Sequence, residues 1–384
     1  MKCSFCKFET VVLKVLFGYL LLIVFGCNYL KEEPKQTYIP FATLNPPDSI
    51  TPEKTLYSNG WESMPVIPPK HWTKKEHKEL EKNLDWFHKA KYGLFFHFLA
   101  PEEGMTIDRW NAMVDSVDVE KFADQVKETG AGYVVLTIGQ DQLYSCAPNP
   151  VLEKLWELRP GSYISRRDLP SDLFDALNKR GIKMMLYLSM NNQFKLPRPE
   201  SFKNETDRFE NWLKVIEYYS TYYGKKCSGW WIDALDEDWT TNYRARVHES
   251  LKRGNPAAIT ASSSYGLSEY THGHCESSWE LQQKVRKPYF GRWEPRYKIQ
   301  WHVLQYLGRD WAKRDTAHST ASMVKYAADI IKGGGVITFD VGTEIYVNNK
   351  HINTVLNIPE GQMIQLLEVK KAVQAINPSD GSGN

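Results

Sequence analysis

The stretch Gly229-Trp230-Trp231-Ile232-Asp233 is short, almost entirely apolar, and closed by a carboxylate. An apolar run without alternating polar residues is typical of a strand that is buried on both faces of a parallel sheet. Five more runs of this kind occur along the chain, over residues 92–98, 133–137, 182–189, 257–261 and 335–341. Together they predict a parallel sheet at the centre of the fold.

Amphipathic helices are expected between these runs. Residues 119–126 and 209–223 carry apolar side chains at the i, i+3, i+4 and i+7 spacing of one helix face. Gly130 and Gly181 lead from such helices into the next apolar run, as in a short αβ loop. The alternation predicts an α/β fold, a TIM-type (β/α)8-like barrel that is irregular or incomplete over residues 262–319. A doubly wound open sheet is the alternative.

The N-terminal end has a different composition. Lys2 and Lys7 precede an apolar run over residues 11–25, which stops at Gly26-Cys27 before a charged segment. The run is too short for a comfortable membrane span, and it resembles a bacterial lipoprotein signal in which Cys27 becomes the lipidated N-terminus. An uncleaved anchor helix is the alternative. Either interpretation places the rest of the chain outside the cytoplasm.

This interpretation divides the chain into four parts. A signal peptide over residues 1–27 is followed by a tether over 28–70, which is rich in Pro, Thr, Ser and Asn. The barrel domain covers residues 71–378, and a disordered tail covers 379–384. We expect an exported lipoprotein, periplasmic or on the cell surface of a bacterium, whose only contact with the membrane is its lipid anchor.

Net charge and cysteine spacing indicate whether the protein binds nucleic acid, a metal or a cofactor. The formal net charge is +2 and no segment concentrates one sign, so we expect no nucleic-acid partner. The cysteines beyond the anchor are Cys146, Cys227 and Cys275. They form neither a disulfide framework nor a zinc-ligand spacing. His272, His274 and Glu276 stand at two-residue intervals, but no second cluster adds ligands, so we predict no metal and no cofactor. The oligomeric state is left open.

Asp233 is the strongest candidate for a catalytic residue. The carboxyl ends of barrel strands form the face that carries function, and Asp233 closes its run beside two tryptophans. A structural role, capping the next helix or pairing with a lysine, is the alternative. Barrel enzymes that use two carboxylates are typically glycosidases, because an oxocarbenium-like transition state needs a negative partner and a proton donor. The second carboxylate is expected in a later loop, as Glu276 or, alternatively, Glu269.

Several segments carry a family resemblance in the same order along the chain. Residues 86–97 are similar to the motif W-F-x-x-A-K-F-G-I-F-x-H, residues 130–137 to G-A-K-Y-V-V-L-T, and residues 333–342 to G-G-N-L-L-L-N-V-G. Trp231-Ile232-Asp233 fits a W-x-D motif, and Arg109-Trp110-Asn111 aligns with a Glu-Trp-Tyr segment of which only the Trp matches. Over residues 86–376 the chain resembles the retaining α-L-fucosidases of glycoside hydrolase family 29. The resemblance implies that Asp233 is the nucleophile.

The resemblance also implies a sugar subsite, with one marked departure. The residues that it brings to the subsite are His97, Trp110, Gln140, Asp141, Tyr144 and Trp231. Where these fucosidases have K-H-H-D-G-F after the second strand, this chain has Gly-Gln-Asp-Gln-Leu-Tyr over residues 139–144, so both sugar-binding histidines are replaced. Gln140 can donate and accept hydrogen bonds, whereas ionised Asp141 can only accept. The pattern of sugar hydroxyls that fits must therefore differ.

We carry two hypotheses for the function. The first is a retaining, α-L-fucosidase-like exo-glycosidase that hydrolyses a terminal glycosidic bond in an oligo- or polysaccharide. In it Asp233 attacks the anomeric carbon and Glu276, or alternatively Glu269, protonates the leaving oxygen. The second is a catalytically inactive, glycan-binding surface lipoprotein with the same fold, which the loss of the histidine pair motivates. In both the partner is a carbohydrate.

Overall fold

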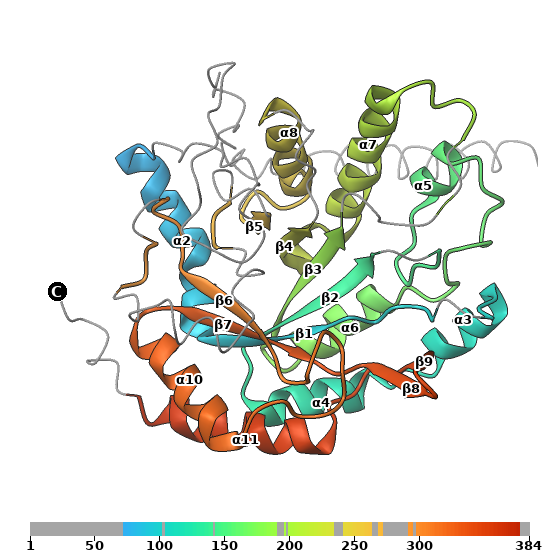
Figure 1. Cartoon of the computed structure of the whole chain (residues 1–384). Helices are drawn as coiled ribbons and strands as arrows, with labels where there is room; N and C mark the ends of the chain where they lie inside the picture. Colours follow the sequence, from blue (N-terminus) through green and yellow to red (C-terminus); the bar gives the residue numbers. More distant parts are fainter. Residues whose placement is uncertain are drawn as a thin grey trace, which may run out of the picture. The chain divides into compact units, whose positions relative to one another are not determined.

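Seven parallel strands form the central sheet in the order β5-β4-β3-β2-β1-β7-β6 (Figure 1). Their bounds are β1 Tyr92–Phe96, β2 Tyr133–Gly139, β3 Lys183–Ser189, β4 Cys227–Asp233, β5 Ile259–Ser262, β6 His302–Tyr306 and β7 Val336–Val341. The order is cyclic: the chain moves outward from β1 to β5 and then returns to β1 from the other side through β6 and β7. A barrel has this order and a doubly wound sheet does not.

The computed structural model describes residues 72–101, 104–140, 143–189, 196, 199–233, 241–262, 268–271, 291–294 and 297–376. The predicted signal peptide, Cys27, the tether and the tail lie outside these residues, as do Asp141 and Glu276. Among the described residues, no helix is both long and apolar enough to cross a membrane.

A short extended segment, residues 268–271, joins the two edges of the sheet. The Glu269 amide donates to the Thr260 carbonyl of β5 (2.8 Å), and the Gln300 amide, just before β6, donates to the Glu269 carbonyl (3.0 Å). The Thr271 amide returns a bond to the Gln300 carbonyl (2.9 Å). Backbone hydrogen bonds thus run from β5 to β6, in the region where the sequence predicts an irregular or incomplete barrel, and this prediction is confirmed.

Helices surround the sheet, and a small antiparallel hairpin follows its last strand. The helices are α2 Lys74–Ala90, α3 Ile107–Asp115, α4 Val119–Thr129, α5 Pro150–Leu155, α6 Leu169–Asn178, α7 Glu205–Tyr223, the 3-10 helix η2 Gly224–Lys226, α8 Thr241–Lys252, α10 Thr320–Lys332 and α11 Glu360–Gln374. The hairpin consists of β8 Glu344–Val347 and β9 Lys350–Thr354. Side chains cap the helix starts, as where Asp118 accepts from the Lys121 amide. Gly130 ends α4 at φ 80°, a left-handed conformation that suits glycine.

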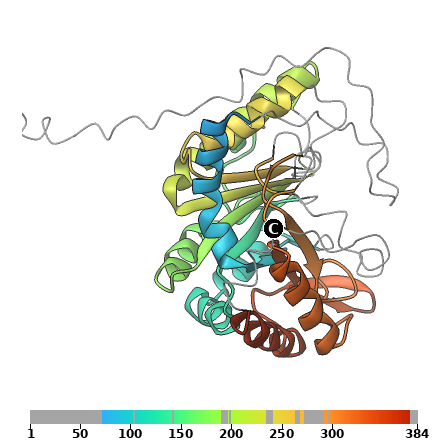
Figure 2. The ribbon, with the colours of Figure 1, turned by 90° about the vertical axis from the view of Figure 1, so that its left-hand side faces the viewer.

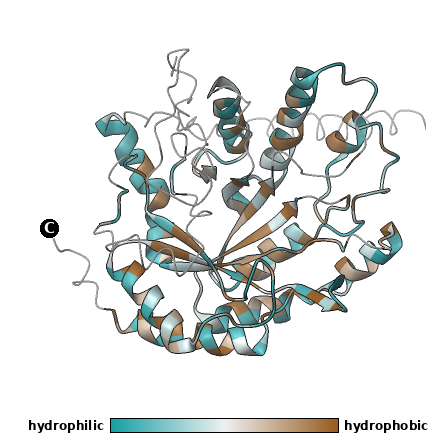
Figure 3. Ribbon diagram, in the orientation of Figure 1, coloured by the Kyte–Doolittle hydropathy of each residue, from teal (hydrophilic) through white to brown (hydrophobic). Residues whose placement is uncertain are grey.

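Side chains along the strands alternate between two hydrophobic layers. The outward layer packs beneath the helices and includes Leu94, Phe96, Val134, Leu136, Trp230, Ile232 and Phe339. The inward layer includes Phe95, Val135, Met185, Tyr187, Trp231, Ile259 and Leu304. The strands are accordingly mostly hydrophobic in Figure 3, whereas the helices carry both colours. Because successive side chains of a strand point to opposite faces of the sheet, each strand residue can be assigned either to the interior of the barrel or to the layer beneath the helices.

Helix α2 closes the N-terminal end of the strands. Its Leu80, Leu84 and Phe87 belong to the inward layer, and α2 lies across the front of the sheet in Figure 2. The Phe87 ring packs on Tyr133 (4.9 Å between centroids) and His302 (5.6 Å), which are the first residues of β2 and β6. With this end covered, the opposite end of the strands is the one that remains for a site.

Two histidines are buried without charge in this framework. His302 lies within hydrogen-bond distance of the Thr271 carbonyl (2.8 Å) and the Thr338 hydroxyl (2.7 Å), and His248 lies 2.8 Å from the Thr260 hydroxyl. Burial lowers the pKa of each imidazole from 6.5 to about 3. Both side chains therefore stay neutral in the folded protein at pH values where the unfolded chain already binds protons.

We expect the free energy of unfolding to fall as the pH drops below about 6.5. The unfolded chain takes up protons at the ordinary pKa while the folded chain does not, so each histidine costs about 1 kcal/mol between pH 7 and pH 5.5. Urea denaturation at these two pH values measures the loss. His248→Gln should reduce the dependence, and His77→Gln, at a partly exposed position of α2, should not. Equal stability at both pH values would contradict the prediction.

Candidate active site

A cavity of about 170 Å³ lies at the carboxyl ends of the strands. Its lining consists of Phe95, His97, Leu99, Gln140, Tyr187, Trp231, Leu304, Trp311, Ala312 and Glu344. Strands β1, β3, β4 and β6 supply the floor, since Phe95, Tyr187, Trp231 and Leu304 all belong to the inward layer. The loop after β6 and the start of β8 complete the wall. The site is therefore where a parallel barrel is expected to carry one.

Asp233 stands at the end of β4 and accepts a hydrogen bond from a residue in the floor of this cavity. Trp231 faces inward, so alternation turns Asp233 the same way. The Tyr187 hydroxyl donates to Asp233 Oδ2 over 2.7 Å. Phe95 stacks on Trp231 (5.6 Å, 22°), which fixes the floor beneath the carboxylate. A phenol donor stabilises the ionised carboxylate, the form in which Asp233 can act as a nucleophile.

His97 is held at the cavity by a buried carboxylate. Its Nδ1 lies 2.7 Å from Asp340 Oδ1, and Asp340 Oδ2 accepts from the Ala312 amide (2.7 Å). Burial raises the pKa of Asp340, and the neighbouring His97 opposes that shift. The pair is oriented so that Nδ1–H points at the carboxylate. The opposite ring nitrogen, Nε2, is then the polar atom that His97 can offer to a ligand.

Gln140 follows β2 and supplies an unsatisfied acceptor. Its Oε1 is buried and has no hydrogen-bond partner among the described residues. A backbone irregularity between Thr137 and Gly139 precedes it. A buried carbonyl oxygen without a partner costs free energy that a ligand donor can recover.

Three of the predicted subsite residues line one cavity. They are His97, Gln140 and Trp231, and Asp233 is joined to the same cavity through Tyr187. Asp141, which follows Gln140 directly in the chain, lies outside the described residues. The structure thus brings together the residues that the sequence places at or just beyond the ends of β1, β2 and β4.

The other two predicted subsite residues lie elsewhere. Trp110 on α3 is fully buried in the outward layer, where its indole N–H donates to the Ser145 carbonyl (2.9 Å). Tyr144 donates to the Met105 carbonyl (3.2 Å) and packs beside Tyr163 (5.8 Å). Neither belongs to the lining of the cavity. Both rings are engaged in packing beneath or beside α3, so their expected contact with a sugar has no counterpart at this cavity.

Of the two candidate proton donors, the structure describes Glu269 but not Glu276. Glu269 Oε1 pairs with Lys252 Nζ (2.7 Å), and Oε2 accepts from the Thr260 amide (2.8 Å). The two side chains of the pair are only 4% and 5% exposed. Thr260 is in register with Trp230, which lies below the strand end that carries Asp233. Glu276 lies outside the described residues, together with His272 and His274 of the alternative metal cluster.

The sequence model of a family described as α-L-fucosidase matches residues 60–346 of this chain. The chain belongs to the α-L-fucosidase family. The sequence resemblance is thereby confirmed, and the match includes every described residue of the cavity lining. A comparison with curated proteins gave no match.

Solved structures share the fold of this family member at low identity. An endo-fucoidan hydrolase of glycoside hydrolase family 107 has a TM-score of 0.57 and 14% identity, over 79% of this chain and 55% of that one. α-L-Fucosidase isoenzyme 1 from Paenibacillus thiaminolyticus has a TM-score of 0.55 and 15% identity, over 79% and 78%. A family 29 α-L-fucosidase from Bacteroides thetaiotaomicron has a TM-score of 0.52 and 14% identity, over 80% and 75%. The chain thus spans little more than half the length of the fucoidan hydrolase.

Several residues of the candidate site were not foreseen from the sequence, and Tyr187, Asp340 and Glu344 are the acidic and hydroxyl-bearing ones among them. These three residues reach the cavity or hold its residues, and the sequence carries a signal for the first two. Tyr187 is an inward residue near the end of a predicted strand, so alternation with a polar tip could have found it. Asp340 stands where the family motif has Asn. Glu344 follows the last barrel strand in a hairpin, and nothing in the sequence pattern places it at the cavity.

We expect Glu269 to support the barrel of this fucosidase-family chain. Glu269→Gln leaves the Lys252 ammonium buried without its counter-charge, which should lower the free energy of unfolding by about 3 kcal/mol. Urea denaturation measures the loss. The matched control is Glu368→Gln, which removes one partner of an exposed pair with Lys371 and should cost less than about 0.5 kcal/mol. An unchanged midpoint for Glu269→Gln would show that the buried pair does not stabilise the fold.

Proposed function

We propose that this protein is a retaining exo-glycosidase of the α-L-fucosidase kind, which removes a terminal sugar from an oligo- or polysaccharide. One observation carries the proposal: Asp233, at the end of β4, is hydrogen-bonded to Tyr187 in the floor of a cavity at the carboxyl ends of the strands. Membership of the α-L-fucosidase family supports the same chemistry. Asp233 is the nucleophile in this proposal.

The reaction proceeds in two displacements. Asp233 attacks the anomeric carbon and forms a glycosyl ester while the bond to the leaving oxygen breaks and Glu276 donates its proton to that oxygen. Water then attacks the same carbon, Glu276 takes up the proton of the water, and Asp233 leaves. We assign Glu276 rather than Glu269 as the acid/base because Lys252 and the Thr260 amide engage both oxygens of Glu269, which leaves neither oxygen to pass a proton to a ligand.

The shape of the cavity supports action at a chain end. It is small, about 170 Å³, and the inward layer of the barrel forms its floor. Phe95, Tyr187 and Trp231 make this floor aromatic, and flat apolar rings suit the apolar face of a sugar. His97 and Gln140 provide polar atoms at the same cavity. The sugar is α-L-fucose or a sugar that shares part of its hydroxyl pattern, since Gln140 replaces a histidine of the family motif.

The second candidate function is glycan binding without turnover. It is favoured by one observation, the replacement of the family's histidine pair by Gln140-Asp141. A cavity that keeps its aromatic rings could still bind a sugar after losing the histidines that donate hydrogen bonds in the transition state. The two candidates differ in whether Asp233 forms and releases a covalent bond.

We expect Asp233→Asn to lower the hydrolysis rate at least about a thousand-fold, because an amide cannot form the glycosyl ester. The measurement uses aryl α-L-fucosides, aryl α-L-galactosides and natural glycans, with the anomeric form of the first product followed by NMR. The control is Asp175→Asn, an exposed carboxylate paired with Lys226, which should keep the wild-type rate. Sugar binding without turnover by the wild type would support the second candidate. A wild-type rate in Asp233→Asn would disprove the nucleophile.

We propose further that Cys27 carries a lipid, which holds the enzyme at the periplasmic face or the surface of a bacterial cell. The sequence around it supports this, with basic residues, an apolar run and Gly26 in front of the cysteine. Expression of Cys27→Ser should release the protein from the membrane fraction, and metabolic labelling with a fatty acid should mark only the wild type. Labelling of both would locate the lipid elsewhere.

A further inference from the structure

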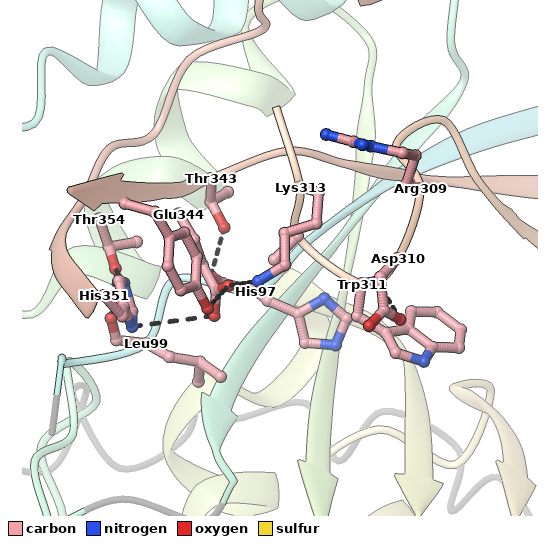
Figure 4. Close-up of polar contacts among 12 residues, drawn as sticks. His97, Leu99, Arg309, Asp310, Trp311, Lys313, Thr343, Glu344, His351 and Thr354 are labelled. Atoms are coloured by element: carbon pink, nitrogen blue, oxygen red, sulfur yellow. Dashed lines mark hydrogen bonds and ion pairs between the residues drawn. The ribbon is translucent and has the colours of Figure 1, made fainter. Parts of the chain in front are cut away.

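Glu344, at the start of β8, brings a carboxylate into the cavity from outside the barrel strands (Figure 4). Its side chain is 14% exposed, and its amide donates to the Ala312 carbonyl (3.1 Å). Glu344 is the one acidic residue among the described residues that line the cavity. The proposed reaction does not use it, so its position calls for a different role.

The surroundings of Glu344 keep it ionised. The Lys313 ammonium lies 3.0 Å from Oε2, and the Tyr346 hydroxyl donates to the same oxygen (2.7 Å). Burial by itself would raise the pKa of Glu344, but the hydrogen bonds from Tyr346 and Lys313 and the positive charges nearby outweigh it and hold the pKa below its ordinary value. Glu344 is therefore a hydrogen-bond acceptor and cannot serve as a proton donor near neutral pH.

One oxygen of this carboxylate is left for a ligand. Both hydrogen bonds fall on Oε2, whereas the His351 Nδ1 atom lies 3.9 Å from Oε1, beyond hydrogen-bond distance. Gln140 Oε1, in the same lining, also lacks a donor within the described part of the chain. Glu344 and Gln140, each with an acceptor oxygen that these residues leave without a donor, thus line one cavity. A ligand that satisfies them must bring hydrogens, as the hydroxyl groups of a sugar do.

The β8–β9 hairpin is fixed where it can present Glu344. The Thr343 hydroxyl donates to the His97 carbonyl (2.7 Å), and the Thr354 hydroxyl donates to the Leu99 carbonyl, so the base of the hairpin is tied to the end of β1. The Arg109 guanidinium donates to the Ile352 carbonyl of β9. Arg109 stands where the family segment has Glu. In this chain a cation at that position anchors a hairpin, and the hairpin supplies a carboxylate of its own.

We propose that Glu344 is a specificity-determining residue whose Oε1 accepts a hydrogen bond from a hydroxyl of the sugar in the cavity. The inference rests on the proposed function and narrows its substrate class. The sugar must carry a free hydroxyl at the position that meets Glu344. A sulfate ester or a carboxylate there would meet the ionised side chain and be excluded by charge, and a deoxy position would leave the acceptor unpaired.

The test compares Glu344→Gln with the surface control Glu368→Gln. KM and kcat are measured on the best aryl glycoside of the panel, and calorimetry measures binding of the corresponding free sugar and its monodeoxy analogues. We expect Glu344→Gln to raise KM and Kd about ten- to a hundred-fold with a smaller change in kcat, since the lost bond is charge-assisted. Glu344→Asp, which keeps the charge, should recover part of the affinity. Thermal unfolding confirms that each variant is folded.

One deoxy analogue identifies the contact. The wild type should bind it about ten- to a hundred-fold more weakly than the parent sugar, whereas Glu344→Gln should bind the two alike. Wild-type KM and Kd in Glu344→Gln, together with an unchanged preference across the analogues, would overturn the inference and leave the glycosidase intact. A wild-type protein that neither binds nor hydrolyses any sugar of the panel would overturn both.

Discussion

The pairing of β1 with both β2 and β7 is the constraint on which the rest of the site depends. It places Phe95 in register with Asp340, although these residues come from opposite ends of the domain. Because side chains alternate, His97 and Asp340 then point to the same interior and meet at 2.7 Å across 243 residues of sequence. Other contacts of the cavity lie around this pairing of β1 with β7. The Ala312 amide donates a hydrogen bond to Asp340, and the Thr343 hydroxyl joins the hairpin to His97.

Two buried carboxylates near the pairing of β1 with β7 show how hydrogen-bond partners set the pKa of a buried acid. Asp340 and Glu344 are both largely buried, yet the pKa of Asp340 is raised by burial while that of Glu344 is lowered. The difference lies in the partners: Asp340 has an imidazole and an amide, whereas Glu344 has an ammonium and a phenol on one oxygen. Asp340 consequently orients a neighbouring ring, and Glu344 offers a fixed negative charge. Two acidic residues of one site therefore have separate functions.

Much of the fold could be predicted because buried parallel strands are apolar without interruption. The six predicted runs all overlap strands, and the barrel itself follows from their alternation with helices. Strand β6 could not be recognised in the same way, since its His302 and Gln305 are polar, and His302 is held by tertiary contacts with Thr271 and Thr338. The segment 268–271 is similarly short and polar, and it pairs only because β5 and β6 already flank it.

The site was predictable only where strand geometry dictates it. Asp233 ends a strand and His97 follows one directly, so their direction follows from the barrel. Trp110 shows the limit: the family motif points to this tryptophan, but the motif does not tell whether the ring faces the interior of the barrel or the layer beneath the helices, and it lies in the latter. Glu344 was beyond reach because its place is fixed by contacts of the hairpin with the end of β1 and with α3, which no periodicity encodes.

In the proposed function, the changed set of polar atoms around the cavity separates the chemistry of the family from the choice of sugar. In the proposed reaction, attack by Asp233 at an anomeric carbon requires that the carbon lie near the end of β4, above the aromatic floor of the cavity. Choice among sugars depends on the polar atoms of the wall, and a mismatch there is penalised because a buried acceptor is left unpaired. With Gln140 in place of a histidine of the family motif and Glu344 arriving from the hairpin, we expect that penalty to fall on a different set of hydroxyls while Asp233 keeps its proposed role.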